Sequence, residues 1–214
     1  MKSLIIGEVD NGTLSQGTLE IIGKLKSENS DFHLVTIGSE ENPIVSSELF
    51  IGTYLKVNSQ ELTLSSVADK IKEIIEENSI NLVLTSSTYV GRDIAGFISV
   101  DLNSSPVSNV INFSFDGDDV ITTNLINGGE SEYITKISSS YKILIIRPKS
   151  FDPIKLELSE IKETFVVENN ELTTAVHDIF IEEKTGPQLE DSKIVISAGR
   201  GMVEVENLKY IEAL

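Results

Sequence analysis

The 214-residue sequence contains no cysteine, which excludes disulfide bonds, thiolate nucleophiles and iron–sulfur clusters and removes most zinc sites. Only two histidines are present. His33 lies within a strand pattern, where we interpret it as a structural or surface residue, and His177 has no Asp, Ser or second His at a catalytic spacing. The sequence therefore gives little support to hydrolytic triads or histidine–metal chemistry.

Positive charge is also scarce, because 17 Lys and Arg residues stand against 34 Asp and Glu residues, for a net charge of -17. Nucleic acids and anionic bilayers bind proteins through cationic side chains, so this balance disfavours both as partners. No apolar run approaches the roughly 18 residues of a membrane-spanning helix. The first residues carry too short an apolar run for a secretory signal, so we expect a cytoplasmic protein.

The clearest structural signal lies in residues 80–102. An apolar run over residues 80–84 is typical of a buried parallel strand, and the hydroxyl residues 85–88 end it. Beyond Gly91, the spacing of apolar residues predicts one helix face, formed by Ile94, Phe97, Ile98 and Leu102. A strand, a polar loop and a helix form half of a βαβ unit, and ligands bind at the carboxyl edge of sheets built from such units.

Strands and helices alternate over the amino-terminal half of the chain. Strand patterns cover residues 3–9, 31–38 and 54–57, and residues 43–50 predict a turn or short helix. Two further helices are predicted, one capped by Ser15 and one by Ser65 or Ser66. This alternation predicts a three-layer α/β/α, Rossmann-like domain with a parallel sheet.

The pattern changes after residue 105. Four strand patterns follow with no room for helices between them, over residues 106–115, 120–126, 133–137 and 142–147. We interpret these strands as an antiparallel extension of the parallel sheet. The acidic residues 116–119 lack the remaining ligands of a calcium loop, so they predict a hairpin turn.

The sequence after the extension predicts a second, truncated α/β unit. Strand or short-helix patterns at residues 165–168 and 176–181 precede a polar linker at residues 182–187, which ends in Gly-Pro. We therefore divide the chain into a first domain, residues 1–188, and the start of a second, residues 189–214.

A glycine-flanked arginine is the strongest candidate site in the second unit. Residues 193–197 predict a buried strand, followed by the turn Ala198-Gly199-Arg200-Gly201 and a helix that begins near Glu204. Backbone N–H groups, a guanidinium fork and the positive end of a helix all suit a diphosphate. A glycine turn that lets the helix pack on the strand explains the same residues without a ligand.

Four segments of the chain resemble the alpha subunits of electron-transfer flavoproteins. They are SSTYVGRDIAGFISVDLNSSPVSNV, KIVISAGRGMVEVENLKYIEAL, EVDNGTLSQGTLEII and IRPKSFDP. The first carries Gly-Arg-Asp at a helix and then a strand with Ser before Asn, and the second carries Gly-Arg-Gly followed by Glu206 and Asn207. The resemblance is spread over the whole chain.

The resemblance implies an electron carrier whose chemistry belongs to its cofactor, so no catalytic residue is expected. In that family the first domain is an adenine-nucleotide-hydrolase-like scaffold, and FAD lies mainly in the second domain of a heterodimer with a beta subunit. Dehydrogenases supply the electrons and an acceptor takes them. The family's cofactor-binding turn corresponds to Gly199, Arg200 and Gly201, whereas Gly91-Arg92-Asp93 is expected to be structural, with the helix dipole stabilising Asp93 by about 0.3–1 kcal/mol.

The sequence departs from the family pattern at its carboxyl end. It stops at Leu214, and the family's later Ser-Arg pair and Gln-Thr-Gly loop have no counterpart. One arginine and two glycines cannot enclose a dinucleotide, so we expect this chain alone to hold no stoichiometric FAD. We also expect the residues after Asp191 to be loosely ordered, or packed on the first domain or a neighbouring copy.

Two other functions are compatible with the sequence. A stand-alone domain could bind adenine nucleotides at the carboxyl edge around Ser86, Ser87 and Gly91, although the first strand ends without a glycine-rich phosphate loop and carries the acidic residues Glu8 and Asp10. A cofactor-free partner of a beta subunit is the third possibility.

Overall fold

A computed structural model describes residues 1–10, 13–38, 52–57, 64–155, 163–167, 189, 192, 194–202 and 204–212. The chain divides into two compact units, Met1–His177 and Asp178–Leu214, and each is described by itself. Several sequence predictions lie outside the described residues, among them the short helix at residues 43–50, the elements and linker at residues 176–187, and His177.

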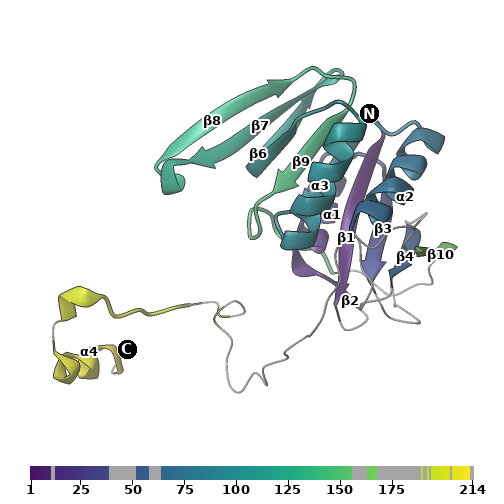
Figure 1. Cartoon of the computed structure of the whole chain (residues 1–214). Helices are drawn as coiled ribbons and strands as arrows, with labels where there is room; N and C mark the ends of the chain where they lie inside the picture. The colour runs from purple at the N-terminus through teal and green to yellow at the C-terminus, as the bar shows by residue number, and fades with distance from the viewer. Residues whose placement is uncertain are drawn as a thin grey trace. The chain divides into compact units, whose positions relative to one another are not determined.

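The first unit is built on a ten-stranded sheet in the order β10-β4-β3-β1-β5-β9-β6-β7-β8, with the short β2 paired to β1 (Figure 1). Its strands are β1 (Ser3–Asp10), β2 (Thr13–Leu14), β3 (Phe32–Gly38), β4 (Gly52–Val57), β5 (Leu82–Ser86), β6 (Pro106–Asp116), β7 (Asp119–Ile126), β8 (Ser131–Ile137), β9 (Lys142–Ile146) and β10 (Glu163–Val167). Neighbours from β10 to β6 are parallel, whereas β6, β7 and β8 pair antiparallel.

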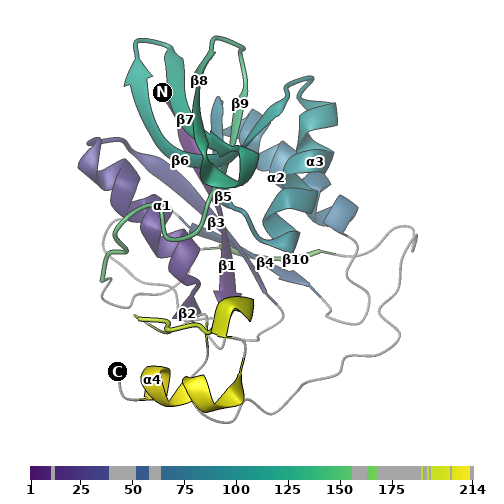
Figure 2. The ribbon, with the colours of Figure 1, turned by 90° about the vertical axis from the view of Figure 1, so that its left-hand side faces the viewer.

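Helices cover both faces of the parallel strands (Figure 2). Helix α1 (Gln16–Ser27) packs on one face through Ile21, Ile22 and Leu25, and α2 (Leu64–Glu77) and α3 (Tyr89–Asp101) pack on the other. The two apolar cores share no residue, because alternate side chains of each strand point to opposite faces. The predicted three-layer α/β/α fold with a parallel sheet and an antiparallel extension is confirmed.

Helix boundaries follow the capping chemistry in two of these three helices. The side chains of Ser15 and Thr88 cap α1 and α3 by accepting hydrogen bonds from the backbone N–H groups of Thr18 and Gly91. The predicted caps of α2 are wrong, since that helix begins at Leu64 and places Ser65 and Ser66 in its first turn. Phe97 was expected on the buried face of α3, but it is 46% exposed, and Ala95 joins Ile94 and Ile98 in the core instead.

Strand β9 corrects the predicted extension. Residues 142–147 were expected to continue the antiparallel strands, yet β9 lies between β5 and β6 and is parallel to both. Every residue of β9 is buried, including Lys142. A strand buried on both faces fits only where helices cover the sheet, so β9 belongs to its centre. The hairpin predicted at residues 116–119 is confirmed by the pairing of Asp116 with Asp119.

The Ser-Asn pair of β6 forms a bulge where this strand changes its pairing partner. The register of β6 shifts between Val107 and Val110, and Asn109 adopts a left-handed φ of 56°. The Asn109 amide donates a hydrogen bond to the Leu125 carbonyl, and the Asn124 amide donates one to the Ser108 carbonyl at 2.6 Å. Side-chain amides on both strands therefore hold the bulge in place.

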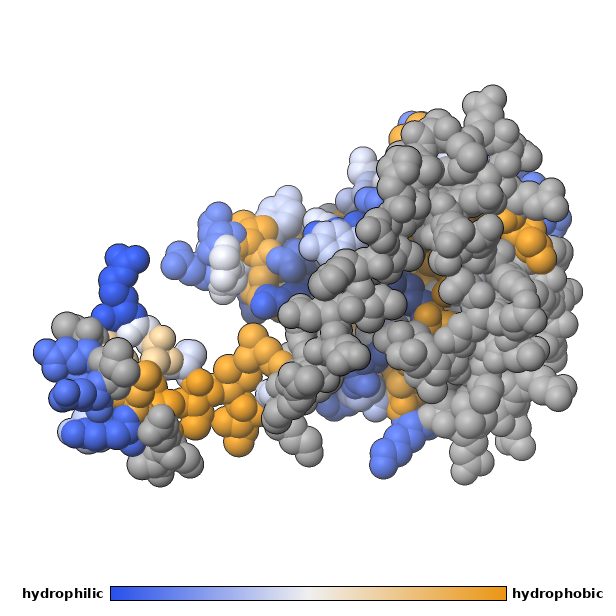
Figure 3. Space-filling model, turned by 60° about the horizontal axis from the view of Figure 1, so that its bottom comes forward, coloured by the Kyte–Doolittle hydropathy of each residue, from blue (hydrophilic) through white to orange (hydrophobic). Residues whose placement is uncertain are grey.

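The described part of the second unit contains short helices and no strand. Residues 194–199 have no regular structure, and Ile194, Val195 and Ile196 are 82%, 55% and 50% exposed. Figure 3 shows apolar side chains at the surface of this unit. The strand predicted at residues 193–197 is therefore not formed in residues 194–197, because its backbone has no neighbouring strand to pair with in the described part of the unit. The predicted helix is replaced by η3 (Val205–Leu208) and α4 (Lys209–Glu212).

Candidate functional site

The carboxyl edge of the sheet between β1 and β5 is the first candidate site. The chain leaves β1 towards α1 on one face of the sheet and leaves β5 towards α3 on the other, so the connections diverge here. Ligands of open α/β sheets bind at such switch points. Ser86, Ser87 and Gly91, the residues of the alternative nucleotide site, all belong to this edge.

An acidic side chain lies between the two strands at this edge. The Glu8 carboxylate accepts a hydrogen bond of 2.5 Å from the Thr88 hydroxyl, and the same hydroxyl accepts one of 2.9 Å from the Gly91 N–H. On the other side, the backbone N–H of Glu8 donates to the Thr18 hydroxyl at 3.2 Å. These bonds connect β1 to the amino-terminal ends of α1 and α3, and they occupy the Glu8 carboxylate and the Gly91 N–H.

Two glycines bring both helices close to the end of β5. A Cβ on Gly91 would lie 2.3 Å from the Ser86 carbonyl oxygen, and a Cβ on Gly17 would lie 2.4 Å from the Ser86 hydroxyl oxygen. Contacts this close require glycine. Side chains and helix ends therefore fill the described part of the β1–β5 edge.

The other two residues of Gly91-Arg92-Asp93 lie on the exposed side of α3. The Arg92 guanidinium donates through Nε to the Thr88 carbonyl at 3.1 Å and lies 5.3 Å from the centre of the Tyr89 ring. Helix α3 begins at Tyr89, so Asp93 comes after its first turn, which contains no acidic residue. The expected stabilisation of Asp93 by the helix dipole is therefore wrong, because that effect is confined to the first turn.

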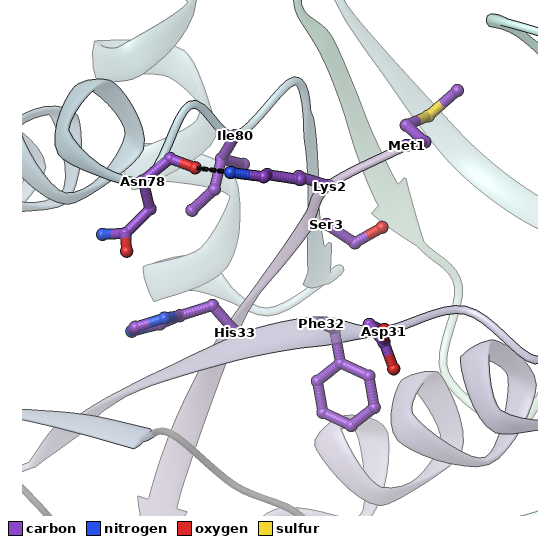
Figure 4. Close-up of a pocket in the computed structure, with 8 residues that line it drawn as sticks. All are labelled: Met1, Lys2, Ser3, Asp31, Phe32, His33, Asn78 and Ile80. Carbon is purple, nitrogen blue, oxygen red and sulfur yellow. Dashed lines mark hydrogen bonds between the residues drawn. The ribbon is translucent and has the colours of Figure 1, made fainter.

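A pocket of about 340 Å³ lies at the opposite edge of the sheet, where β1 and β3 begin (Figure 4). Its lining includes Lys2, Ser3, Asp31, His33 and Asn78, and the Lys2 ammonium donates to the Asn78 carbonyl at 3.0 Å. Figure 4 shows the side chains of Asp31 and His33 pointing in different directions, so these residues form no catalytic triad. The described residues also contain no cluster of three His, Asp or Glu side chains that could hold a metal ion.

A buried carboxylate holds residues 147–153, the segment that follows β9 and is called the exit segment below. Glu20 is 2% exposed, and its carboxylate accepts a hydrogen bond of 2.8 Å from the backbone N–H of Lys149. Burial raises the pKa of the Glu20 carboxyl, and the backbone N–H groups of Lys149, Ser150 and Phe151 oppose that rise. Sequence reasoning missed this role, although an acidic residue directly before the buried Ile21 and Ile22 could have indicated it.

The exit segment is also packed closely on α1. A Cβ on Gly23 would lie 2.6 Å from the Asp152 carbonyl oxygen. The Phe151 ring meets the Phe113 ring edge to face at 5.9 Å, and the Lys24 ammonium lies 5.8 Å from the centre of the Phe151 ring. The IRPKSFDP motif therefore has a structural role in the first unit, where it packs on α1.

The glycine-flanked arginine of the second unit has a different character. Arg200 begins the 3-10 turn η2 (Arg200–Met202), which the Met202 N–H closes by donating to the Gly199 carbonyl at 3.0 Å. Arg200 is exposed, and no described atom lies within 4 Å of a Cβ built on Gly199 or Gly201. No contact among the described residues therefore supports the explanation that these glycines let the helix pack on the strand. A ligand could reach the backbone of the turn and the guanidinium together.

The helix that follows the turn adds little to this site. Its two parts, η3 and α4, are four residues each, so the predicted contribution of the positive end of a helix dipole is small. The structure leaves Arg200 and the backbone of Gly199 and Gly201 as the groups that could bind a diphosphate. Among the described residues of the first unit, no arginine with a glycine on both sides lies at the carboxyl edge.

Comparison with known proteins places these features in a family. Residues 3–174 match the family model described as the electron transfer flavoprotein domain. The chain is 23% identical over 223 residues to the electron transfer flavoprotein subunit alpha of Bacillus subtilis, covering 100% of this chain and 68% of that subunit. It is 22% identical over 226 residues to the corresponding Pseudomonas aeruginosa subunit, covering 100% of this chain and 70% of that one.

A second group of relatives is named differently. Protein FixB of Clostridium saccharobutylicum is 23% identical over 165 residues, which cover 72% of this chain and 48% of that protein. The chain thus spans between about half and 70% of the length of these three curated relatives.

Proposed function

Because this chain belongs to the electron transfer flavoprotein domain family, we propose that it acts as the alpha-type subunit of an electron transfer flavoprotein. In this function the chain helps to hold FAD within a heterodimer with a beta-type subunit. Electrons come from dehydrogenases and pass to a separate acceptor. The chain is then an electron carrier subunit, and it needs no catalytic residue of its own.

The exposed Arg200 turn is the observation that supports a role in cofactor binding. FAD carries a diphosphate, and an arginine fork with open glycine backbone on both sides suits that group. When bound, the flavin would accept and release the electrons. Arg200, Gly199 and Gly201 would hold the diphosphate, and the chain's other contribution would be to orient it.

The filled β1–β5 edge supports the assignment of the first unit as a scaffold. The Thr88–Glu8 hydrogen bond and the close approach of Gly91 to Ser86 argue against a stand-alone adenine-nucleotide-binding domain. Residues of a turn cannot enclose a dinucleotide, so we propose that most contacts to FAD come from outside the 214 residues. None of the helices described is long and apolar enough to cross a membrane, and we propose a cytoplasmic location.

Calorimetry with three ligands tests the proposal. The chain is titrated with FAD, with AMP and with a beta-type subunit of an electron transfer flavoprotein, and FAD is then added to the mixture of both subunits. We expect the beta-type subunit to bind, and FAD to bind more tightly to the mixture than to the chain alone.

The other results separate the alternatives. Tight AMP binding to the chain alone would favour the nucleotide-binding domain. Binding of the beta-type subunit without any FAD uptake would favour the cofactor-free partner. Flavin absorbance near one equivalent in the purified chain would contradict our expectation that the chain alone holds no stoichiometric FAD.

A further inference from the structure

The turn that carries Arg200 is held by a side chain five residues beyond it. The Asn207 amide Nδ2 donates a hydrogen bond of 2.7 Å to the Met202 carbonyl, which also accepts one of 2.6 Å from the Glu204 N–H. Met202 is the last residue of η2, and its own N–H closes the turn on Gly199. The Met202 carbonyl at the end of the turn thus accepts two hydrogen bonds, one from a side chain and one from the backbone.

Asn207 is suited to this role by its position. It lies in η3, half-buried, whereas its neighbours Glu206 and Leu208 are exposed. The Asn207 N–H donates to the Glu204 carbonyl at 3.0 Å, so both the backbone and the side chain of Asn207 face back towards the turn. All these bonds join residues between Gly199 and Asn207.

We propose that Asn207 is a positioning residue that holds the Gly199-Arg200-Gly201 turn in the conformation that binds a diphosphate. This inference rests on the proposed function, because it gives Asn207 a role only if Arg200 binds that group. A turn that is already ordered loses less conformational entropy when it binds a ligand. Removing the Asn207 amide leaves Arg200 and both glycines present but lets the turn open.

The expected effect follows from the value of one hydrogen bond. A side-chain bond of this kind contributes enough to change an equilibrium by about two- to tenfold. We therefore expect Asn207→Ala to weaken diphosphate binding by about that factor. Arg200→Gln, which removes the charged fork itself, should abolish measurable binding.

The experiment uses the full 214-residue chain and ADP as the probe. Backbone amide shifts of residues 199–202 are followed by NMR during the titration, with AMP as the control ligand that lacks the second phosphate. The variants are Asn207→Ala, Arg200→Gln and the matched control Tyr210→Phe, which changes an exposed side chain of the same unit without changing its charge. Hydrogen exchange of the Met202 amide reports the turn directly, and circular dichroism reports the fold.

Three results support the inference together. Asn207→Ala weakens ADP binding two- to tenfold and speeds exchange at the Met202 amide, Tyr210→Phe changes neither, and the dichroism spectrum stays that of the wild type. If Asn207→Ala binds ADP as the wild type does while Arg200→Gln does not, the inference is overturned and the proposed function stands. If the wild type shows no saturable ADP shifts at residues 199–202, or if Arg200→Gln binds ADP as tightly as the wild type, the diphosphate role of Arg200 is wrong, and the inference falls with it.

Discussion

Replacing Glu20 should destabilise the first unit and change how its stability depends on pH. The Glu20 carboxylate is buried and accepts backbone hydrogen bonds from the exit segment, including the one from Lys149 at 2.8 Å. Lys149 itself has a left-handed φ of 64°, a conformation that the surrounding contacts must maintain. Glu20→Ala removes the acceptor and leaves a cavity beneath the segment.

The cost can be estimated from the groups left without a partner. A hydrogen bond to a charged group contributes about 1.5–3 kcal/mol, and the bonds that share one carboxylate do not add fully. We therefore expect Glu20→Ala to lower the free energy of unfolding by about 2–4 kcal/mol. Glu20→Gln keeps one acceptor oxygen and should cost at least about 1 kcal/mol less.

The pH dependence has a defined sign. Burial raises the pKa of the Glu20 carboxyl in the folded protein above its ordinary value, so the folded state binds this proton more tightly than the unfolded state. The corresponding stability is present below the unfolded pKa of about 4.3 and is lost as the pH rises through the higher folded pKa. The stability difference between the wild type and Glu20→Gln should therefore grow as the pH falls from 7 towards 4.5.

Urea unfolding followed by circular dichroism measures these differences. Glu77→Gln, an exposed residue at the end of α2, is the matched control and should change the free energy of unfolding by less than about 0.5 kcal/mol. The reasoning is refuted if Glu20→Ala costs no more than this control. It is also refuted if the difference between the wild type and Glu20→Gln shrinks on acidification, since that result requires a lowered pKa.

Further substitutions test the packing of the β1–β5 edge and the bulge of β6 in the first unit. Gly91→Ala would place a Cβ 2.3 Å from the Ser86 carbonyl oxygen and should lower the free energy of unfolding in urea by about 1–3 kcal/mol. Gly96→Ala lies in the same helix with nothing within 4 Å of the added Cβ, and it should raise the free energy of unfolding by about 0.5–1 kcal/mol. Equal effects of the two substitutions would contradict the closed β1–β5 edge. Asn109→Ala and Asn109→Gly both lose the bond to Leu125, but only alanine is strained in the left-handed conformation, so Asn109→Ala should cost about 1–2 kcal/mol more than Asn109→Gly in the same assay. A smaller loss for Asn109→Ala than for Asn109→Gly would show that the bulge does not depend on this conformation.

Local patterns predicted the layers of the fold because they report burial. The apolar runs of β1, β3 and β5 and the serine cap of α1 each follow from residues within one element. The position of β9 could not be read in this way, because it depends on which distant strand pairs with it. Adjacent strands in the sequence suggested hairpins, and the burial of both faces of β9 overruled that suggestion.

The candidate site shows the same limit. The Gly-Arg-Gly turn was found from its residues, but the strand expected before it requires backbone partners that the described part of the second unit does not provide. The closed β1–β5 edge depends on Thr88 reaching Glu8, which is 80 residues away in the sequence, so no local motif could reveal it. Asn207 was recognised only as part of a resemblance, and no pattern in the sequence indicated its contact with Met202.

The central claim is that the first unit is a closed scaffold and that the Arg200 turn is the contact for a diphosphate. Mapping ADP-induced amide shifts over the whole chain by NMR tests both parts at once. The account predicts shifts concentrated at residues 199–202 and none at residues 85–91. Saturable shifts at residues 85–91, with residues 199–202 unchanged, would contradict it.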